Sequence, residues 1–540
     1  MAQVNVSGLT FCYEGSFDNI FENVSFSIDT DWKLGLIGRN GKGKTTFLNL
    51  LLGKYEYRGS ITTSTVFEYF PYPVEEAWMT DNTIDVIERL EPEYELWKIC
   101  RELDLLHTDA ELLYRPYHTL SHGERTKVML ALLFSGEQAF LLIDEPTNHL
   151  DMPTRKLLVE YLKSKKGFIL VSHDRWFLDQ CVDHVLVLNR NTITVEKGNF
   201  STWWENKQKK DAFELAENEK LKHEIAKLDE AAKKNAMWAD KVEATKIGFD
   251  PVKEHDRFLD TRAYIGARSK KMQKRSKTFA SRSEAAIQEK QGLLKDLESP
   301  VELKLMPLTH HKEIYIACRD YSCGYATFGN HVDQDQCDVR DDVKDSSSGA
   351  YVIKNLTMQL KRGDRMILQG ANGCGKSTLI KSILQNQNVT VLNHVGKQTE
   401  CSKAEESFVK EGSLEAASGL LISYINQDTS FLKGSLEDYI RACGVEESLF
   451  KAILRQLDFE RVQFEKTMED YSEGQRKKVL IAGSLLQQAH LYIWDEPLNY
   501  IDVFSRMQIE QLILKYQPTM LIVEHDQTFA DHIATQKIFL

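Results

Sequence analysis

The chain has 540 residues, of which 42% are hydrophobic and 27% are charged, and it contains only 11 prolines. This composition is typical of a folded globular protein and excludes a disordered or fibrous chain, and the length suggests three or four domains. The formal net charge of -12 argues against a dedicated nucleic-acid or anionic-membrane surface, although an average can hide a basic patch.

The cysteines and the apolar segments indicate in which cellular compartment the protein resides. Nine cysteines lie far apart with no C-x-x-C pair, which predicts reduced thiols and neither a zinc site nor a disulfide framework. No window holds the roughly 18 uninterrupted apolar residues that a membrane span requires, and the first residues lack the pattern of a secretory signal. We therefore expect a cytoplasmic protein that is neither secreted nor embedded in a membrane.

The sequence repeats itself in two halves. The pattern G-x-x-x-x-G-K-[ST] occurs at residues 38–45 and again at 370–377, each time after a short apolar run, at 34–37 and 366–368. Three later blocks recur in the same order, at 120–125 and 471–476, at 140–145 and 491–496, and at 171–174 and 523–526. Apolar strands that alternate with helices around such a motif predict two α/β domains, each with a mostly parallel sheet covered on both faces. Two polar stretches of the second half, 329–349 and 386–418, are expected to be surface loops.

Each glycine-rich motif predicts a phosphate-binding loop. A glycine-rich turn that opens a helix presents backbone N–H groups to phosphates, while lysine adds a charge and serine or threonine binds Mg²⁺. The expected nucleotide-binding residues are Gly38, Asn40, Gly41, Gly43, Lys44, Thr45 and Thr46 in the first half, and Gly370, Asn372, Gly373, Gly375, Lys376, Ser377 and Thr378 in the second.

The later blocks place carboxylates and a histidine at strand ends. Asp144 and Asp495 end apolar runs and are expected to bind the hydrated Mg²⁺, while the adjacent Glu145 and Glu496 are candidates for activating the attacking water. His173 and His525 follow short apolar runs and are expected to contact the γ-phosphate. The ordinary alternatives are carboxylates that cap a strand and structural histidines, and the matching spacing in both halves argues against them.

The blocks that begin at Ser121 and Ser472 resemble the signature of ATP-binding-cassette (ABC) ATPases. The resemblance implies that the serine hydroxyl and the glycine N–H of one half cover the γ-phosphate bound by the other half, so that two halves of one monomeric chain enclose two ATP molecules. It further implies that Tyr13 and Tyr325 stack on adenine, although a core role for either is also open, and that Gln427 contacts the metal. The implied signature residues are Ser121 and Gly123 in the first half and Ser472 and Gly474 in the second.

Several positions depart from the ABC pattern. His122 and Glu473 replace a signature glycine, Tyr72 occupies the place of the metal-contacting glutamine in the first half, and the second half has Leu498 and Tyr500 where threonine and histidine are usual. These departures lead to the hypothesis that the two sites hydrolyse ATP unequally.

A charged segment separates the halves and gives expected domains at 1–204, 205–300 and 301–540. Residues 205–299 are almost free of proline and glycine, and apolar residues recur at helical spacing on both sides of a break at 248–251. We expect an antiparallel helical hairpin with a tip at about 247–260, in which each arm of about 40 residues spans on the order of 60 Å.

The linker also reverses the sign of the charge. Residues 205–299 contain 22 Lys and Arg against 18 Asp and Glu, a net charge of +4, which leaves -16 for the rest of the chain. A solvated helix face and a phosphate-contacting face both fit this pattern. The apolar tip residues, Phe249 among them, are candidates to contact a binding partner or to pack on one another. The candidate RNA contacts are Phe249, Arg262, Arg268, Lys270, Lys271, Lys274, Arg275 and Lys277.

Two fused cassettes joined by a charged hairpin, without a membrane domain, resemble the ABC-F translation proteins. Strings such as residues 32–41, 211–220 and 265–268 resemble the Lsa-type branch, which confers resistance to lincosamides, streptogramin A and pleuromutilins. The resemblance implies an ATP-dependent protein that binds the bacterial 70S ribosome through rRNA and P-site tRNA and protects it from drugs, with no role at membranes or on DNA. The alternatives are a housekeeping ABC-F translation factor and the ATPase subunit of a transporter.

Overall fold

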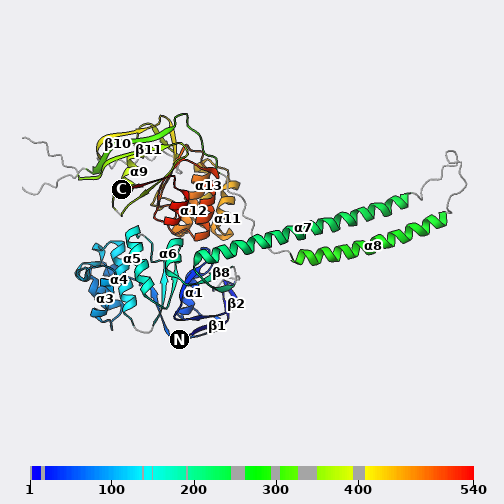
Figure 1. Ribbon diagram of the computed structural model, residues 1–540, viewed down its shortest axis with the longest axis horizontal. Helices are drawn as coiled ribbons and strands as arrows, with labels where there is room; N and C mark the ends of the chain where they lie inside the picture. Colours follow the sequence, from blue (N-terminus) through cyan, green and yellow to red (C-terminus); the bar gives the residue numbers. More distant parts are fainter. Residues whose placement is uncertain are drawn as a thin grey trace, which may run out of the picture. The chain divides into compact units, whose positions relative to one another are not determined.

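The computed structural model describes residues 3–13, 19–136, 139–148, 150–189, 192–244, 262–293, 305–325, 350–371, 373–392 and 408–540. The chain divides into two compact units, Met1–Trp203 with Val301–Leu540, and Trp204–Pro300. The first unit contains the two repeated halves, and the second contains the segment between them (Figure 1).

The first half is built on a six-stranded sheet in the order β5-β6-β7-β3-β8-β9. All neighbours pair in parallel except β8 and β9, which are antiparallel. The strands are β3 (Lys33–Ile37), β5 (Val66–Phe70), β6 (Ala139–Asp144), β7 (Phe168–Val171), β8 (His184–Leu188) and β9 (Ile193–Lys197). Every residue of β7 is buried, as expected for a parallel strand covered on both faces.

A second, antiparallel sheet and several α-helices complete the described part of the first half. The sheet has the order β2-β1-β4, with β1 (Gln3–Phe11), β2 (Phe21–Asp29) and β4 (Arg58–Thr62), and its apolar residues share a core with β3, β6 and β7. The helices are α1 (Lys44–Leu51), α2 (Thr83–Leu90), α3 (Leu96–Leu105), α4 (His122–Ser135), α5 (Met152–Ser164) and α6 (Arg175–Cys181).

The second half repeats this plan. Its six-stranded sheet has the order β13-β15-β16-β17-β12-β18 and is parallel throughout. Its strands are β12 (Arg365–Gln369), β13 (Val389–Val391), β15 (Leu420–Ile425), β16 (Leu491–Asp495), β17 (Met520–Val523) and β18 (Gln536–Phe539). The antiparallel sheet has the order β11-β10-β14, with β10 (Ile314–Tyr325), β11 (Ala350–Lys361) and β14 (Phe408–Ala416). The helices are α9 (Lys376–Leu384), α10 (Leu436–Cys443), α11 (Glu447–Gln456), α12 (Glu473–Leu486), α13 (Val503–Tyr516) and α14 (Gln527–Ile533).

The structure confirms the predicted α/β halves and corrects one loop. Residues 386–418 were expected to form a surface loop, but β13 and β14 lie within this stretch. β14 is an edge strand whose residues 410–412 are exposed, so it lacks the apolar run by which a strand is recognised. The other expected loop, 329–349, lies outside the described residues.

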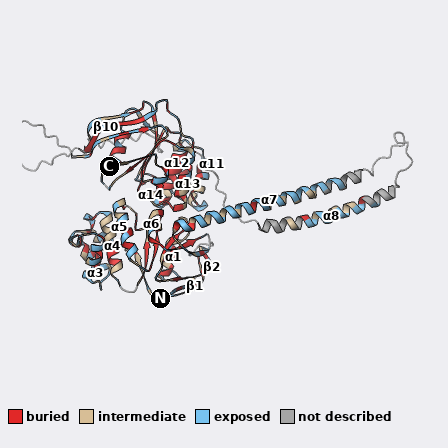
Figure 2. Ribbon diagram, in the orientation of Figure 1, coloured by how far each residue is buried: buried red, intermediate tan, exposed pale blue. Residues whose placement is uncertain are grey.

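The described residues of the unit Trp204–Pro300 lie in two long helices, α7 (Phe200–Ala244), which begins just before the unit, and α8 (Arg262–Leu293). The 45 residues of α7 span roughly 65 Å. Leu221, Ile225, Leu228 and Ala232 form one half-buried stripe along α7, whereas Phe213 is 70% exposed, and most of the helix surface is exposed (Figure 2). The antiparallel pairing of these helices stays a prediction, and the expected tip at 247–260 lies outside the described residues.

Candidate nucleotide-binding sites

Both phosphate-binding loops lie between the first parallel strand of a half and the helix that follows it. In the first loop Gly41 and Gly43 have φ angles of 80° and 90°, a left-handed conformation that favours glycine. The Nζ atom of Lys44 donates to the carbonyl oxygen of Gly38 at 2.8 Å and to Oδ1 of Asn40 at 3.1 Å. In the second loop Nζ of Lys376 donates to the carbonyl oxygen of Gly370 at 2.8 Å. Each ammonium group is therefore held over its own loop.

The residues expected to bind Mg²⁺ meet in each half. The Thr45 hydroxyl lies 3.2 Å from Oδ2 of Asp144, and the Ser377 hydroxyl lies 3.1 Å from Oδ2 of Asp495. Oδ1 of Asp495 is buried and has no hydrogen-bond partner among the described residues. Burial raises the pKa of Asp144, and burial together with the charge of Glu496 raises the pKa of Asp495 to about 6. Hydroxyl and carboxylate oxygens are ligands that Mg²⁺ prefers, so the pair in each half could bind the ion. Oδ1 of Asp495, which no described residue engages, is free to do so.

Glu145 and Glu496 occupy the same unusual backbone conformation at the ends of β6 and β16. Their φ angles are 51° and 47°, which is uncommon for a residue with a side chain and costs energy. Nε2 of His173 lies 3.3 Å from Oε1 of Glu145, and Nε2 of His525 lies 3.7 Å from Oε1 of Glu496. The structure thus brings each predicted glutamate to the histidine of its own half.

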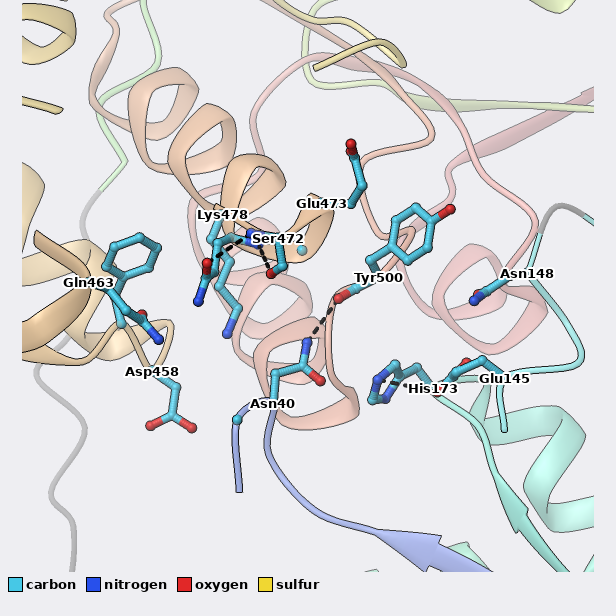
Figure 3. A pocket seen from close by; sticks show the side chains of 14 residues that line it. Asn40, Glu145, Asn148, His173, Asp458, Gln463, Ser472, Glu473, Lys478 and Tyr500 are labelled. Atoms are coloured by element: carbon cyan, nitrogen blue, oxygen red, sulfur yellow. Dashed lines mark hydrogen bonds and ion pairs between the residues drawn. The ribbon is translucent and has the colours of Figure 1, made fainter. Parts of the chain in front are cut away.

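The first cavity, of about 350 Å³, combines residues from both halves (Figure 3). The first half supplies Asn40, Gly41, Glu145 and His173, and the second half supplies Ser472 and Gly474 among others. Nδ2 of Asn40 donates to the carbonyl oxygen of Tyr500 at 2.9 Å, so the phosphate-binding loop of one half contacts the other half directly. A Cβ on Gly474 would lie 2.6 Å from the same carbonyl oxygen, which explains why glycine is required there.

The second cavity, of about 640 Å³, also combines residues from both halves, although the predicted Ser121 and Gly123 are not among the residues that line it. The second half lines it with Lys376, Ser377 and Glu496 among others, and the first half adds His122, which lies between the predicted Ser121 and Gly123. Ser121 and Ser472 also cap α4 and α12, because each side chain accepts a hydrogen bond from a backbone N–H of the first turn.

The two cavities differ at the position of the predicted metal-contacting glutamine. Nε2 of Gln427 donates to Oε2 of Glu496 at 2.8 Å. The register of β5 on β6 places Tyr72 at the equivalent position, as predicted. The hydroxyl that reaches the carboxylate, however, is that of Tyr69, which donates to Oδ2 of Asp144 at 3.1 Å. Tyr69 is not recognisable from the sequence, because it lies inside a strand and belongs to no motif.

The pKa values of the two glutamates are shifted in opposite directions. Burial and the charge of Asp144 raise the pKa of Glu145 to about 8. Burial opposes the ionisation of Glu496, but the neighbouring His525 and the charges of Lys477 and Lys376 outweigh it and lower its pKa. Burial and the nearby Lys44 hold the pKa of His173 well below its usual value, so this imidazole is neutral.

Other predicted residues are placed in part. The hydroxyl of Tyr13 lies 2.7 Å from Oγ1 of Thr46, and the ring is 42% exposed, so it lies beside the first loop. The backbone of Tyr325 ends β10, but its side chain is not described, and Asn372 lies outside the described residues.

The predicted RNA contacts lie mainly on α8. Phe249 is outside the described residues, as are the side chains of Arg262 and Arg268, whereas the remaining predicted basic side chains are exposed. A hollow of about 450 Å³ lies on this basic face. It is lined by Lys271, Lys274, Arg275, Thr278, Phe279 and Arg282.

Two composite cavities, each with a phosphate-binding loop and the signature helix of the other half, define an ABC ATPase. A family model described as "ABC transporter" matches residues 21–148 and 353–499, more than half of the chain, and the chain therefore belongs to that family. It hydrolyses ATP. Across the described ranges, no helix is long and apolar enough to cross a membrane.

The similar proteins confirm the resemblance to ABC-F ATPases. The chain is 27% identical to the ribosome protection protein VmlR of Bacillus subtilis over 98% of this chain and 85% of that protein. It is 24% identical to the energy-dependent translational throttle protein EttA of Mycobacterium tuberculosis over 96% of this chain and 88% of that protein. A solved structure of the archaeal ribosome recycling factor aABCE1 has a TM-score of 0.55 at 16% identity, covers 98% of this chain and 87% of that one, and supports the fold.

Proposed function

We propose that this chain is a cytoplasmic ABC-F ATPase that binds the bacterial 70S ribosome and protects it from antibiotics of the peptidyl-transferase centre. The observation that carries the proposal is one chain with two composite nucleotide cavities and an exposed basic face on α8. Similarity to VmlR, named a ribosome protection protein, and to the erythromycin resistance ATP-binding protein MsrA of Staphylococcus epidermidis supports it.

The motif residues of the two phosphate-binding loops, strand ends and signatures have proposed roles in ATP hydrolysis. Lys44 and Lys376 bind the β- and γ-phosphates, and Glu145 and Glu496 orient the attacking water and accept its proton. Thr45 with Asp144, and Ser377 with Asp495 and Gln427, would hold Mg²⁺, which when bound neutralises charge on the phosphates. Ser472 and Gly474 cover the phosphates held by the first loop, and Ser121 and Gly123 those held by the second.

The two halves act as one switch in a monomer. ATP holds the first domain (1–204) and the third domain (301–540) together in the ribosome-binding form, and hydrolysis releases them. The linker (205–300) reaches toward the P-site tRNA, where it displaces the drug or resets the tRNA. The exposed cations of α8 contact rRNA phosphates.

The test is a hydrolysis-deficient trap. Glu145→Gln with Glu496→Gln should remain bound to 70S ribosomes in the presence of ATP, because the variant cannot hydrolyse ATP and stays in the ribosome-binding form. Co-sedimentation with ribosomes measures this binding. A matched control, Lys44→Ala with Lys376→Ala, should not co-sediment because its loops no longer bind the phosphates. Loss of co-sedimentation from the glutamine variant would overturn the mechanism.

A second candidate function is that of a translation factor without a role in drug resistance. The name of the relative EttA, an energy-dependent translational throttle protein, favours it. Expression in a drug-sensitive host separates the two functions, because only a protection protein raises the inhibitory concentration of lincosamides, streptogramin A or pleuromutilins. A transporter subunit would instead co-fractionate with membranes and not with ribosomes.

A further inference from the structure

Lys477 is a buried cation that the proposed chemistry does not use. It lies in α12, its side chain is 2% exposed, and its Nζ atom donates to the carbonyl oxygen of Asn426 at 3.0 Å. A buried ammonium group requires hydrogen bonds and counter-charges. The carbonyl oxygen of Asn426 provides a hydrogen bond. Burial lowers the pKa of Lys477, and the negative charges of Asp495, Glu496, Glu524 and Glu473 oppose this shift.

The bond to Asn426 connects α12 to the second cavity. The next residue is Gln427, whose Nε2 donates to Oε2 of Glu496 at 2.8 Å. Oε2 of Glu496 also accepts a hydrogen bond from Nδ2 of Asn499 at 2.8 Å. Lys477 therefore fixes the backbone immediately before the side chain that orients the proposed water-activating glutamate.

The same helix begins at the first cavity. Ser472 and Gly474 line that cavity, and Lys477 follows Ser472 by five residues, about 7.5 Å along the helix axis. Helix α12 thus contacts the first nucleotide site with its N-terminal residues. About one and a half turns further along, Lys477 of the same helix contacts the loop that carries Gln427.

The reciprocal connection has no equivalent lysine. The residue of α4 at the same distance from its signature serine is Thr126, whose Oγ1 donates to the carbonyl oxygen of His122 in its own helix at 3.0 Å. In the first half Pro71 and Tyr72 stand where the second half has Asn426 and Gln427. The connection therefore runs from the first cavity to the second and is not reciprocated.

We propose that Lys477 is a positioning residue of the second nucleotide site. It holds the Asn426–Gln427 loop against Glu496 and, through α12, makes hydrolysis in the second cavity depend on nucleotide that engages Ser472 and Gly474 in the first. The inference rests on the proposed roles of Glu145 and Glu496.

The experiment measures ATP turnover of the full chain at one site at a time. Hydrolysis in a Glu145→Gln background reports the second site, and hydrolysis in a Glu496→Gln background reports the first. Lys477→Met should lower kcat about ten- to hundredfold in the Glu145→Gln background, because small displacements at a reacting centre are costly, with KM changed less than twofold. In the Glu496→Gln background the same change should alter kcat less than twofold, and Lys477→Arg should restore most of the loss.

The connection itself is tested with Ser472→Ala in the Glu145→Gln background. If Lys477 transmits the effect of Ser472, adding Ser472→Ala to Lys477→Met should cost little further, because residues that act as a unit are not additive. Fully additive losses, equal losses in both backgrounds, failure of Lys477→Arg to restore turnover, or no loss at all would each overturn the proposal. Turnover that survives Glu145→Gln with Glu496→Gln would instead show that the proposed glutamate roles are wrong, and this inference with them. No ribosome is present, so the ribosomal function is tested separately.

Discussion

At the residue scale, Asp144 and Asp495 have different surroundings despite their equivalent positions. Asp144 accepts hydrogen bonds from Thr45 and Tyr69, whereas Asp495 accepts one from Ser377, and its Oδ1 has no partner among the described residues. Tyr424 occupies the position of Tyr69 in the second half, but its hydroxyl donates to Oδ1 of Asn426 at 3.3 Å. In the first site the tyrosine hydroxyl therefore bonds to the aspartate, whereas in the second site the equivalent hydroxyl bonds to Asn426.

This difference predicts unequal effects of removing the two hydroxyls. Tyr69→Phe should lower the free energy of unfolding by about 1.5–3 kcal/mol, because hydrogen bonds to charged groups contribute about that much. Tyr424→Phe is the matched control and should cost about 0.5–1.5 kcal/mol, the usual range for a neutral pair. Denaturant midpoints measured without nucleotide and Mg²⁺ give both values. Equal losses would mean that the hydrogen bond to Asp144 contributes no more to the free energy of unfolding than an ordinary neutral hydrogen bond.

At the element scale, motif spacing predicted which residues stand at strand ends and loop turns. The parallel strands read as apolar runs, so Asp144 and Asp495 could be placed at their exits from the sequence. Tyr69 and Lys477 could not, because each acts through a contact made in the folded chain, and Lys477 and Asn426 are 51 residues apart. The edge strand β14 was missed for another reason, since exposed polar residues carry no period that distinguishes a strand from a loop.

The basic face of α8 leads to a prediction about salt. Lys271, Lys274 and Arg275 are exposed and line one hollow on α8, where a phosphate could reach their charges. Replacing all three by alanine should weaken ribosome binding and reduce the slope of log affinity against log salt by about 2–3, since each lost phosphate contact contributes about 0.7–0.9. Co-sedimentation of the Glu145→Gln, Glu496→Gln protein over a salt series measures this slope.

Two lysines of α7 provide the control. Nζ of Lys233 lies 2.7 Å from a carboxylate oxygen of Asp229, and Nζ of Lys234 lies 2.7 Å from one of Glu230. Because these charges are already paired along the helix, their replacement by alanine should leave the salt slope nearly unchanged. A slope that falls equally in both variants would mean that the charge of the linker as a whole attracts the ribosome, with no localised contact on α8.

At the scale of the whole molecule, the two nucleotide sites are closed by different contacts. At the first site Arg39 lies 3.2 Å from Asp458 and Lys42 lies 3.2 Å from Glu460, both across the two halves. At the second site the equivalent loop residues are Ala371 and Cys374, which carry no charge. The repeat therefore conserves the nucleotide chemistry and varies the electrostatics that hold the halves together.

These ion pairs predict that closure at the first site depends on salt. Arg39→Ala with Lys42→Cys copies the second loop and should raise the KM for ATP about three- to tenfold at low salt in the Glu496→Gln background, because partly exposed pairs contribute about 0.2–1 kcal/mol each. The difference should shrink at about 0.5 M salt, where the screening length falls to a few ångströms. Exchanging the charges, Arg39→Asp with Asp458→Arg, should recover part of the affinity. A KM that is unchanged at low salt would show that the hydrogen bond from Asn40 to Tyr500 and the packing around it suffice to close this site.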